Sequence, residues 1–388
     1  MDLETMTNVI LNNDFELHEG KDKSNNEINE NLDEEIKEKN ETIIEDSEKE
    51  KGKSKNKLRN KRKNKVVLTR KQKVLRFFKR LAITLVVFVM LIIIGIVLFF
   101  KTNLFQKYKE LWVLTAMSTM NHQYLATWFL SEEEINEILA KYEVENNENS
   151  ELHEVSVEAK LENEIKVEKI TGKNYVGYVM TVSDPTKVKF VDSRKKSMGT
   201  KLSGIVKENN AIAGINAGGF EDPDGKGMGN ILNTPVIMNQ KMLYGNPNNV
   251  MSLIGLSKNG ELILGKYNYN EAIEHGIESA VDFGPFIIVN GNNQIKTSNA
   301  GGLQPRMCIG QKKDGTFVFV CIDGRQPGYS LGTTLLEVQN IFNKYDVYNA
   351  ANLDGGSSAT MYYDGKLVNK ASTPAGERYL PNAIIVTK

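Results

Sequence analysis

The chain has 388 residues, a formal net charge of zero and only four histidines and two cysteines. This length predicts about two domains, and the histidine count excludes a zinc site built on histidines in the C-terminal part, where His275 is the single histidine. Zero net charge hides a strong asymmetry near the N-terminus, because residues 1–50 carry a net charge of −12 and residues 51–80 carry +15.

Neither of these two charged segments has a periodic apolar face. The first holds 17 acidic and 5 basic residues, and the second holds 15 basic residues and no acidic one. Such sequences cannot bury enough apolar surface to fold alone, so we expect residues 1–80 to be a disordered tail, first acidic and then basic.

Residues 81–100 are twenty uncharged, mostly apolar residues, which predicts one transmembrane helix. Basic residues greatly outnumber acidic ones just before this segment, so the positive-inside rule predicts a cytoplasmic N-terminus and an extracellular C-terminal domain in the cell membrane. We expect the bilayer to hold residues 81–100 and anionic lipid to contact residues 51–80. Nucleic acid is the disfavoured partner of the basic segment.

Residues 101–164 are predicted to be a helical stalk followed by a polar linker. Ser131 and Glu134 form a capping-box pattern, and Ile135, Ile138 and Leu139 follow at helical spacing. The apolar helix before them could pack on its own domain, on a partner helix or in the membrane interface, and we favour its own domain.

Residues 165–388 are predicted to form one α+β domain with a mostly antiparallel sheet and a few helices. Short β-rich runs alternate with turn signals, and amphipathic patterns predict helices at residues 201–208 and 334–345. Four Asn-Gly or Asp-Gly pairs indicate hairpin turns, beginning at Asn259, Asn290, Asp314 and Asp364.

A two-residue turn at Asp314-Gly315 would place Cys308 opposite Cys321 at a non-hydrogen-bonded position. A disulfide there would suit an oxidising exterior. Two buried thiols are the alternative, and we favour them because both faces of the hairpin are apolar and a cross-strand bridge needs demanding geometry.

The stretch from Asn352 to Met361 inserts one carboxylate, two glycines and two hydroxyls between apolar runs. It is either a tight turn or a binding site, because glycine pairs permit both positive φ and close approach to a ligand. No G-x-S-x-G motif is present, so acid–base chemistry is expected to come from carboxylates or tyrosines. Arginines recur near these carboxylates, which fits either phosphate recognition or structural ion pairs.

The order and spacing of several motifs resemble the phosphodiester glycosidase family across residues 165–388. The matching elements are INAGGF (215–220), GPFIIVNG (284–291), Arg306 in QPRMCIG, IDGRQPG (322–328), TTLLEV (333–338), NLDGGSSATM (352–361), and Arg378 followed by residues 381–384. Ser357 stands where family members often carry a third glycine. The resemblance implies an N-acetylglucosamine phosphodiester α-N-acetylglucosaminidase-like hydrolase that cleaves a sugar-phosphate diester on the glycosyl side.

This resemblance and the residue types together predict the site. The expected catalytic carboxylates are Asp354 and Asp323, with Glu337 a weaker candidate because Thr334 and Glu337 also form a capping box. The expected substrate-binding residues are Arg306, Arg325, Arg378, Asn216, Gly218, Gly219, Asn352, Gly355, Gly356, Ser357 and Asn382.

No cofactor is expected. A divalent ion held by Asp323, Asp354 and Asn352 is left open, and a D-x-D-G pattern at residues 222–227 lacks the later ligands of a calcium loop, so a polar surface loop is favoured there. Whether Asp354 attacks, activates water or binds a metal also stays open, as does retaining or inverting chemistry. The expected role is trimming of cell-envelope or exopolysaccharide glycans, and the alternative is a non-catalytic membrane-anchored glycan-binding or regulatory protein.

Overall fold

A computed structural model describes residues 69–152, 164–195, 197–223 and 227–388. The acidic and basic segments of residues 1–68 therefore lie outside the described residues. The contacts divide the chain into two units, Met1–Met90 and Leu91–Lys388, and the boundary falls inside the first described helix.

The first described helix is α2, Arg70–Lys101, and it contains the predicted transmembrane segment. Of the described helices, it is the one long and apolar enough to cross a membrane. It begins at Arg70, so residues 70–80, which we expected to belong to the disordered tail, are helical. Most residues between Arg70 and Arg80 are Lys, Arg, Gln or Leu, which are good helix formers, so an existing helix can extend through them.

The remaining elements belong to the second unit. Its helices are α3 Gln106–Met117, α4 Tyr124–Thr127, α5 Glu132–Lys141, α6 Leu202–Glu208, α7 Tyr269–Glu274 and α8 Leu335–Lys344, with short 3-10 helices η2 Asn103–Phe105, η3 Pro185–Lys187 and η4 Gly356–Ser358. Its strands are β1 Ile165–Thr171, β2 Val176–Val182, β3 Val188–Asp192, β4 Thr200–Lys201, β5 Ala211–Asn216, β6 Phe220–Glu221, β7 Ile231–Leu232, β8 Val236–Met238, β9 Lys241–Tyr244, β10 Met251–Ser257, β11 Leu262–Tyr267, β12 Ile277–Asp282, β13 Phe286–Val289, β14 Asn292–Asn293, β15 Arg306–Gln311, β16 Phe317–Ile322, β17 Asn349–Asn352, β18 Met361–Tyr363, β19 Lys366–Leu367, β20 Tyr379–Leu380 and β21 Asn382–Thr387.

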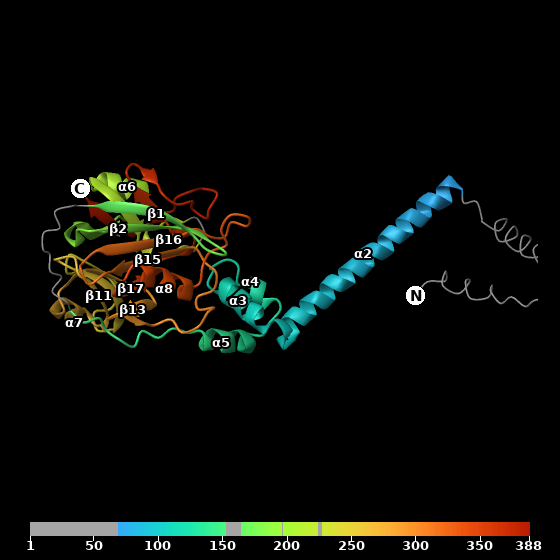
Figure 1. Cartoon of the computed structure of the whole chain (residues 1–388), viewed down its shortest axis with the longest axis horizontal. Helices are drawn as coiled ribbons and strands as arrows, with labels where there is room; N and C mark the ends of the chain where they lie inside the picture. Colours follow the sequence, from blue (N-terminus) through green and yellow to red (C-terminus); the bar gives the residue numbers. More distant parts are fainter. Residues whose placement is uncertain (1–68, 153–163, 196, 224–226) are drawn as a thin grey trace, which may run out of the picture. The chain divides into compact units, whose positions relative to one another are not determined.

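Three main sheets build the domain. Their strand orders are β1-β2-β16-β15-β17-β13-β14, β11-β10-β12-β8-β9 and β19-β18-β5-β21-β3, and two short pairs join β20 with β4 and β6 with β7. Every strand ladder given for the described residues is antiparallel, which confirms the predicted α+β class with mostly antiparallel sheets. Figure 1 shows β1, β2, β16 and β15 side by side in the largest sheet.

Alternation along β16 explains how the largest sheet is buried on both faces. Phe317, Phe319 and Cys321 face a core shared with the other sheets. Val318, Val320 and Ile322 face a second cluster that includes apolar residues of α8. Successive side chains of a strand point to opposite faces, so a fully apolar strand here supplies both layers.

The β15–β16 hairpin does not have the two-residue turn that we expected. Met307 pairs with Cys321, and Cys308 pairs with Val320, so the register differs by one residue. Lys312 and Thr316 close a three-residue loop in which Gly315 has φ of 86°, which absorbs the extra residue. A shift of one residue moves a side chain to the other face, so Cys308 and Cys321 lie in different cores as free, buried thiols.

The other predicted turns follow the sequence closely. Asn290-Gly291 and Asp364-Gly365 are two-residue hairpin loops in which both residues have positive φ. Helices α6 and α8 match the predicted spans to within one residue at each end. The Ser131 and Thr334 capping boxes are both present.

The stalk helices pack on the same unit as the sheets, as predicted. The hydroxyl oxygen of Thr115 in α3 accepts the backbone N–H of Leu303 at 3.0 Å, and the Thr115 carbonyl accepts the side-chain amide of Gln304 at 2.7 Å. Residues 146–151 then run along the sheet edge, where Ser150 exchanges hydrogen bonds with the backbone of Leu264. The first part of the predicted polar linker is therefore bound to the domain, and residues 153–163 lie outside the described residues.

Candidate active site

The loop after β17 carries Asp354, and hydrogen bonds with the Asn216 side chain hold this loop in place. The Asn216 side-chain amide donates to the carbonyl of Asp354 at 2.6 Å, and its side-chain oxygen accepts the backbone N–H of Thr360 at 3.0 Å. The backbone N–H of Asp354 donates to the carbonyl of Ala217 at 3.0 Å. Asn216 is fully buried, so one side chain of β5 holds both ends of the Gly-Gly turn.

The Asp354 side chain is half-buried, and burial raises the pKa of its carboxyl to about 6. A hydrogen bond from Ser358, the positive charges of Arg378 and Arg325, and the N–H of Gly355 act in the opposite direction. Asp354 is therefore ionised in most molecules at neutral pH while it stays poorly solvated. A poorly solvated carboxylate between cations is the arrangement expected of a reactive group.

Arg325 lies against the second glycine of the turn. A β-carbon on Gly356 would be 3.2 Å from both terminal guanidinium nitrogens of Arg325, and Gly356 has φ of 58°. The Arg325 guanidinium donates to the side-chain oxygen of Gln304 at 2.6 and 3.1 Å. Burial lowers the pKa of Arg325. The positive charge of Arg378 lowers this pKa further, and the negative charge of Asp354 raises it. The glycine thus lets an arginine approach the backbone of the turn.

Arg378 reaches the same turn from the other side. It donates to the hydroxyl of Ser357 at 2.9 Å and forms an ion pair with Asp222. Its guanidinium carbon lies 4.8 Å from the centre of the Phe220 ring, close enough for a cation–π contact. Ser357, which departs from the family's third glycine, therefore has a hydrogen-bond partner here.

Asp222 is a site residue that the sequence analysis did not assign. One carboxylate oxygen of Asp222 accepts from Arg378, and the other accepts the backbone N–H of Gly227 at 2.7 Å. Asp222 therefore both orients Arg378 and fixes the loop that contains Gly227. The D-x-D-G pattern was the available signal, but residues 224–226 lie outside the described residues. Within the described part of the chain, no group of three or more His, Cys, Asp or Glu side chains is arranged to hold a metal ion.

Asp323 is buried in a network of its own. One oxygen accepts the Asn369 amide and the Lys370 N–H, each at 3.0 Å, and the other accepts the Tyr329 hydroxyl at 2.9 Å. Burial raises its pKa, and these hydrogen bonds oppose the shift. Asp323 thus links residues 323–325 to residues 369–370 through hydrogen bonds. Its catalytic role remains a prediction.

Glu337 and Arg306 are likewise engaged with the protein. Glu337 accepts the Thr333 hydroxyl at 2.7 Å and the Thr334 N–H at 3.2 Å as part of the α8 capping box. Arg306 is buried, donates to the carbonyls of Thr333, Gly301 and Gly302, and has a pKa lowered to about 10 by burial. These contacts favour structural roles for both side chains.

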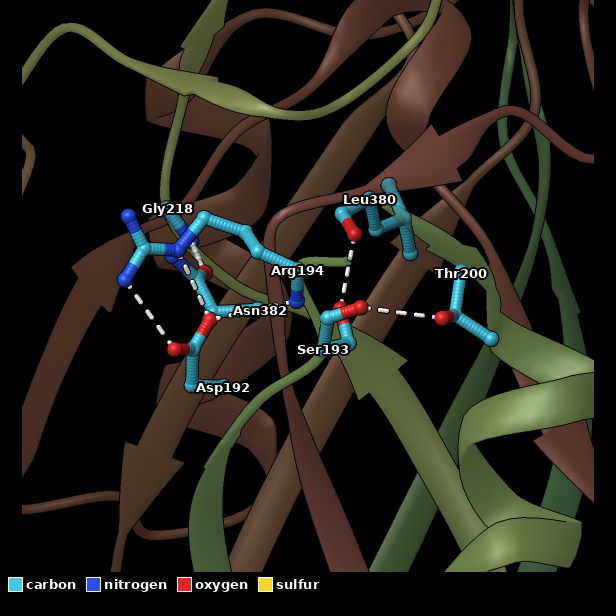
Figure 2. A network of polar contacts seen from close by, with 7 residues as sticks. All are labelled: Asp192, Ser193, Arg194, Thr200, Gly218, Leu380 and Asn382. Atoms are coloured by element: carbon cyan, nitrogen blue, oxygen red, sulfur yellow. Dashed lines mark hydrogen bonds and ion pairs between the residues drawn. The ribbon is translucent and has the colours of Figure 1, made fainter. Parts of the chain in front are cut away.

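Asn382 and Gly218 meet at the end of β21. The Asn382 side-chain oxygen accepts the Gly218 N–H at 2.7 Å, and Figure 2 shows this bond beside the ion pair of Arg194 with Asp192. Asn382 is 1% exposed, and its side-chain nitrogen has no partner among the described residues. A buried, unused donor fits the predicted binding role of Asn382.

Three further predicted residues, Asn352, Gly219 and Gly355, lie against neighbouring loops. The Asn352 side-chain amide donates to the carbonyl of Gly284 at 2.9 Å. A β-carbon on Gly219 would lie 3.1 Å from the Phe283 ring, and one on Gly355 would lie 2.6 Å from the carbonyl oxygen of Pro305. The structure thus gathers Asp354, Arg325 and Arg378 around the turn and uses Asn216 and Asn352 to support it.

In a comparison with known proteins, residues 209–387 match the family model for phosphodiester glycosidase, and this range contains every predicted site residue. The chain carries a phosphodiester glycosidase domain. Strands β1–β4, helix α6 and the stalk precede the matched region. The recognition made from the sequence motifs is thereby confirmed.

The similar curated proteins are distant. N-acetylglucosamine-1-phosphodiester alpha-N-acetylglucosaminidase of Mus musculus is 24% identical over 225 residues, which are 52% of this chain and 42% of the mouse protein. The Bos taurus enzyme is 27% identical over 136 residues, 30% of this chain and 25% of that protein. An SPbeta prophage-derived uncharacterized protein of Bacillus subtilis is 40% identical over 68 residues, 18% of this chain and 10% of that protein. The chain thus spans less than half the length of these relatives.

Two solved structures also share similarity with this chain. The zebrafish N-acetylglucosamine-1-phosphodiester alpha-N-acetylglucosaminidase catalytic domain, auto-inhibited by its pro-peptide, has a TM-score of 0.49 and 20% identity, and the match covers 62% of this chain and 87% of that one. An exported protein from Burkholderia pseudomallei has a TM-score of 0.37 and 15% identity, with 55% and 74% of the two chains covered.

Proposed function

We propose that this phosphodiester glycosidase domain hydrolyses the bond between the anomeric carbon of a sugar and the phosphate of a diester, releasing the sugar and leaving a phosphomonoester. The observation that carries the proposal is the position of Asp354, which is half-buried, has a pKa near 6, and lies within the electrostatic reach of Arg325 and Arg378. These are the charges that a phosphate leaving group and a developing positive charge on the sugar would require.

In this reaction the arginines and Asp354 have different roles. A phosphate leaves readily as an anion, because its second pKa is about 6, so a general acid is less needed than for a sugar alcohol. The arginines stabilise the departing phosphate, and Arg325 is suited to this because its hydrogen-bond partner, Gln304, is neutral. Asp354 acts on the sugar side, either by attack on the anomeric carbon or by removing a proton from water.

Within the same proposal, α2 anchors the enzyme in the cell membrane and the basic residues before it keep the N-terminus in the cytoplasm. The domain would then face outward and act on phosphodiester-linked sugars of cell-envelope or exopolysaccharide glycans. Protease added to intact cells should remove the C-terminal domain and spare the N-terminal tail; protection of the domain would contradict this orientation.

The activity is tested with the full chain in lipid nanodiscs and an α-N-acetylglucosaminyl phosphodiester as substrate. Wild type should release free sugar, and Asp354→Asn should lower kcat by about 10²- to 10⁴-fold, as expected for loss of a base or nucleophile. Asp364→Asn is the matched control, because Asp364 is exposed in a hairpin turn with positive φ, which Asn tolerates.

Binding of the diester without release of sugar would favour the alternative of a non-catalytic glycan-binding protein. The engagement of Asp323 and Glu337 in protein hydrogen bonds is the observation that keeps this alternative in view. Near-normal turnover by Asp354→Asn would instead show that the reaction uses another carboxylate.

A further inference from the structure

A hollow lies where residues 144–146 cross the loop between β12 and β13. It has a volume of about 410 Å³ and opens to solvent. Its lining combines residues from the stalk linker with two strand ends: Val144, Asn146, Thr234, Ser252, Asp282, Phe283, Gly284 and Pro285. A volume of this size lies within the range of small-molecule sites.

Two polar groups that line this hollow lack the hydrogen-bond partners or the solvation that such groups usually have. The Thr234 hydroxyl oxygen is buried and has no hydrogen-bond partner among the described residues. The Asp282 carboxyl is half-buried, accepts the backbone N–H of Ser252, and has a pKa raised to about 6 by burial. Buried polar groups normally have partners. The Thr234 oxygen is closed to water in this conformation, so a ligand in the hollow would reach it by a rotation of the threonine side chain, and the Asp282 carboxylate lines the same hollow.

The charge of the lining separates this hollow from the arginine-rich turn. It contains one carboxylate, and no Lys, Arg or His is among its described lining residues. A phosphate would be repelled here. An ammonium ion can donate to the Asp282 carboxylate and to the Thr234 oxygen, but it cannot accept from the Thr234 O–H as well as donate to the carboxylate. A neutral hydroxyl group can do both, because it donates to the carboxylate and accepts from the threonine.

The remaining lining favours a ring with an apolar face. Phe283 and Pro285 supply apolar surface, and the Asn146 side-chain oxygen is held by the Phe286 N–H at 2.8 Å. The Asn146 side-chain nitrogen lies 3.3 Å from the position that a β-carbon of Gly284 would take, so glycine leaves room for this amide. The lining is thus divided between polar residues (Asn146, Thr234, Ser252 and Asp282) and apolar ones, as a sugar ring with polar edges and an apolar face requires.

The hollow adjoins the loop system of the active site. Phe283 packs against Gly219, and the carbonyl of Gly284 accepts the side chain of Asn352, two residues before Asp354. We propose that this hollow binds a neutral sugar ring, with Asp282 and Thr234 hydrogen-bonding its hydroxyl groups and Asn146 contributing from the linker. A glycan held here would lie beside the proposed reaction centre, yet its binding can be measured without turnover, so the two proposals can fail separately.

The test measures binding of methyl α-N-acetylglucosaminide to the full chain in lipid nanodiscs by titration calorimetry, which avoids glycoside detergents. Wild type should bind this neutral probe more tightly than it binds methylammonium. Asp282→Asn should weaken binding by about tenfold or more, as expected for a hydrogen bond to a charged group, and Thr234→Val by about two- to tenfold. Asp364→Asn is the matched control and should bind as wild type does.

Thermal unfolding of each variant shows whether it is folded, and Thr234→Val, which keeps the side-chain shape, decides the test if Asp282→Asn does not fold. The proposal is overturned if wild type does not bind the neutral probe up to its solubility limit. It is also overturned if both hollow variants bind as wild type does, or if methylammonium binds more tightly than the neutral sugar.

Discussion

Asp354→Asn should stabilise the protein at neutral pH while it removes activity. Burial raises the pKa of this carboxyl from 3.8 to about 6 in the folded protein. The folded state therefore holds the proton more tightly than the unfolded state, so ionisation opposes folding, and the loss of stability grows as pH rises from about 4 to about 6. A shift of about 2 units at 1.36 kcal/mol each corresponds to about 3 kcal/mol above pH 6.

The neutral amide of asparagine avoids this cost at every pH. For a domain of this size, 1 kcal/mol corresponds to roughly 2–4 °C in Tm, so Asp354→Asn should unfold about 6–12 °C higher than wild type at pH 7.5. At pH 4 the two proteins should differ by about 0.5 kcal/mol.

Differential scanning calorimetry of the full chain in nanodiscs measures both values, with Asp364→Asn as the exposed control. A variant that is no more stable than wild type at pH 7.5 would refute the account of a poorly solvated carboxylate. An equal gain at pH 4 and pH 7.5 would show that the gain does not come from ionisation.

Further predictions concern the turn, the thiols and the stalk. Gly356→Ala should lower kcat/KM by tenfold or more, because the added β-carbon meets the Arg325 guanidinium. Gly276 also has positive φ but nothing within 4 Å of an added β-carbon, so Gly276→Ala should cost about 1–2 kcal/mol of stability and leave kcat/KM unchanged. Equal kcat/KM values for the two variants would contradict the contact between Gly356 and Arg325. Cys308 and Cys321 should both be alkylated after unfolding without reductant and neither before it, and an intact mass 2 Da below the reduced chain would contradict free thiols. Gly302→Ala should loosen the stalk, because its β-carbon would lie 2.6 Å from the backbone of α3, and proteolysis within α3 should become faster; an unchanged cleavage rate would argue against docking.

The pattern of apolar residues and turn dipeptides was enough to predict the fold class, helices α6 and α8, and hairpins at Asn259, Asn290, Asp314 and Asp364. Asn290-Gly291 and Asp364-Gly365 behave as two-residue loops because each pair adopts positive φ at both positions. The same dipeptide at Asp314 gives a three-residue loop instead, and this difference depends on the strand register rather than on the dipeptide. One extra residue is enough to separate the two cysteines.

For the charged residues of the site, the sequence likewise predicts some features and misses others. The sequence identifies Asp354, Arg325 and Arg378 as candidates, and the fold brings them to one turn. The sequence does not show that Arg306 donates to backbone carbonyls or that Asp323 accepts from residues 369–370. Thr333 and residues 369–370 come from distant segments, and the carbonyls of Gly301 and Gly302 turn toward Arg306 only in the folded loop. Asp222 was visible only as part of the D-x-D-G pattern and Asp282 was given no role, because both owe their significance to burial and to contacts with other segments.

The central claim is that the bond broken is the one between the anomeric carbon and oxygen. Hydrolysis of an α-N-acetylglucosaminyl phosphodiester by the full chain in water enriched in oxygen-18 tests it directly, with mass spectrometry of both products. Water attacks the sugar carbon in this account, so the label should appear in the sugar's anomeric hydroxyl and be absent from the phosphomonoester. Label in the phosphomonoester would show cleavage at phosphorus and contradict the assignment of Asp354 to the sugar side.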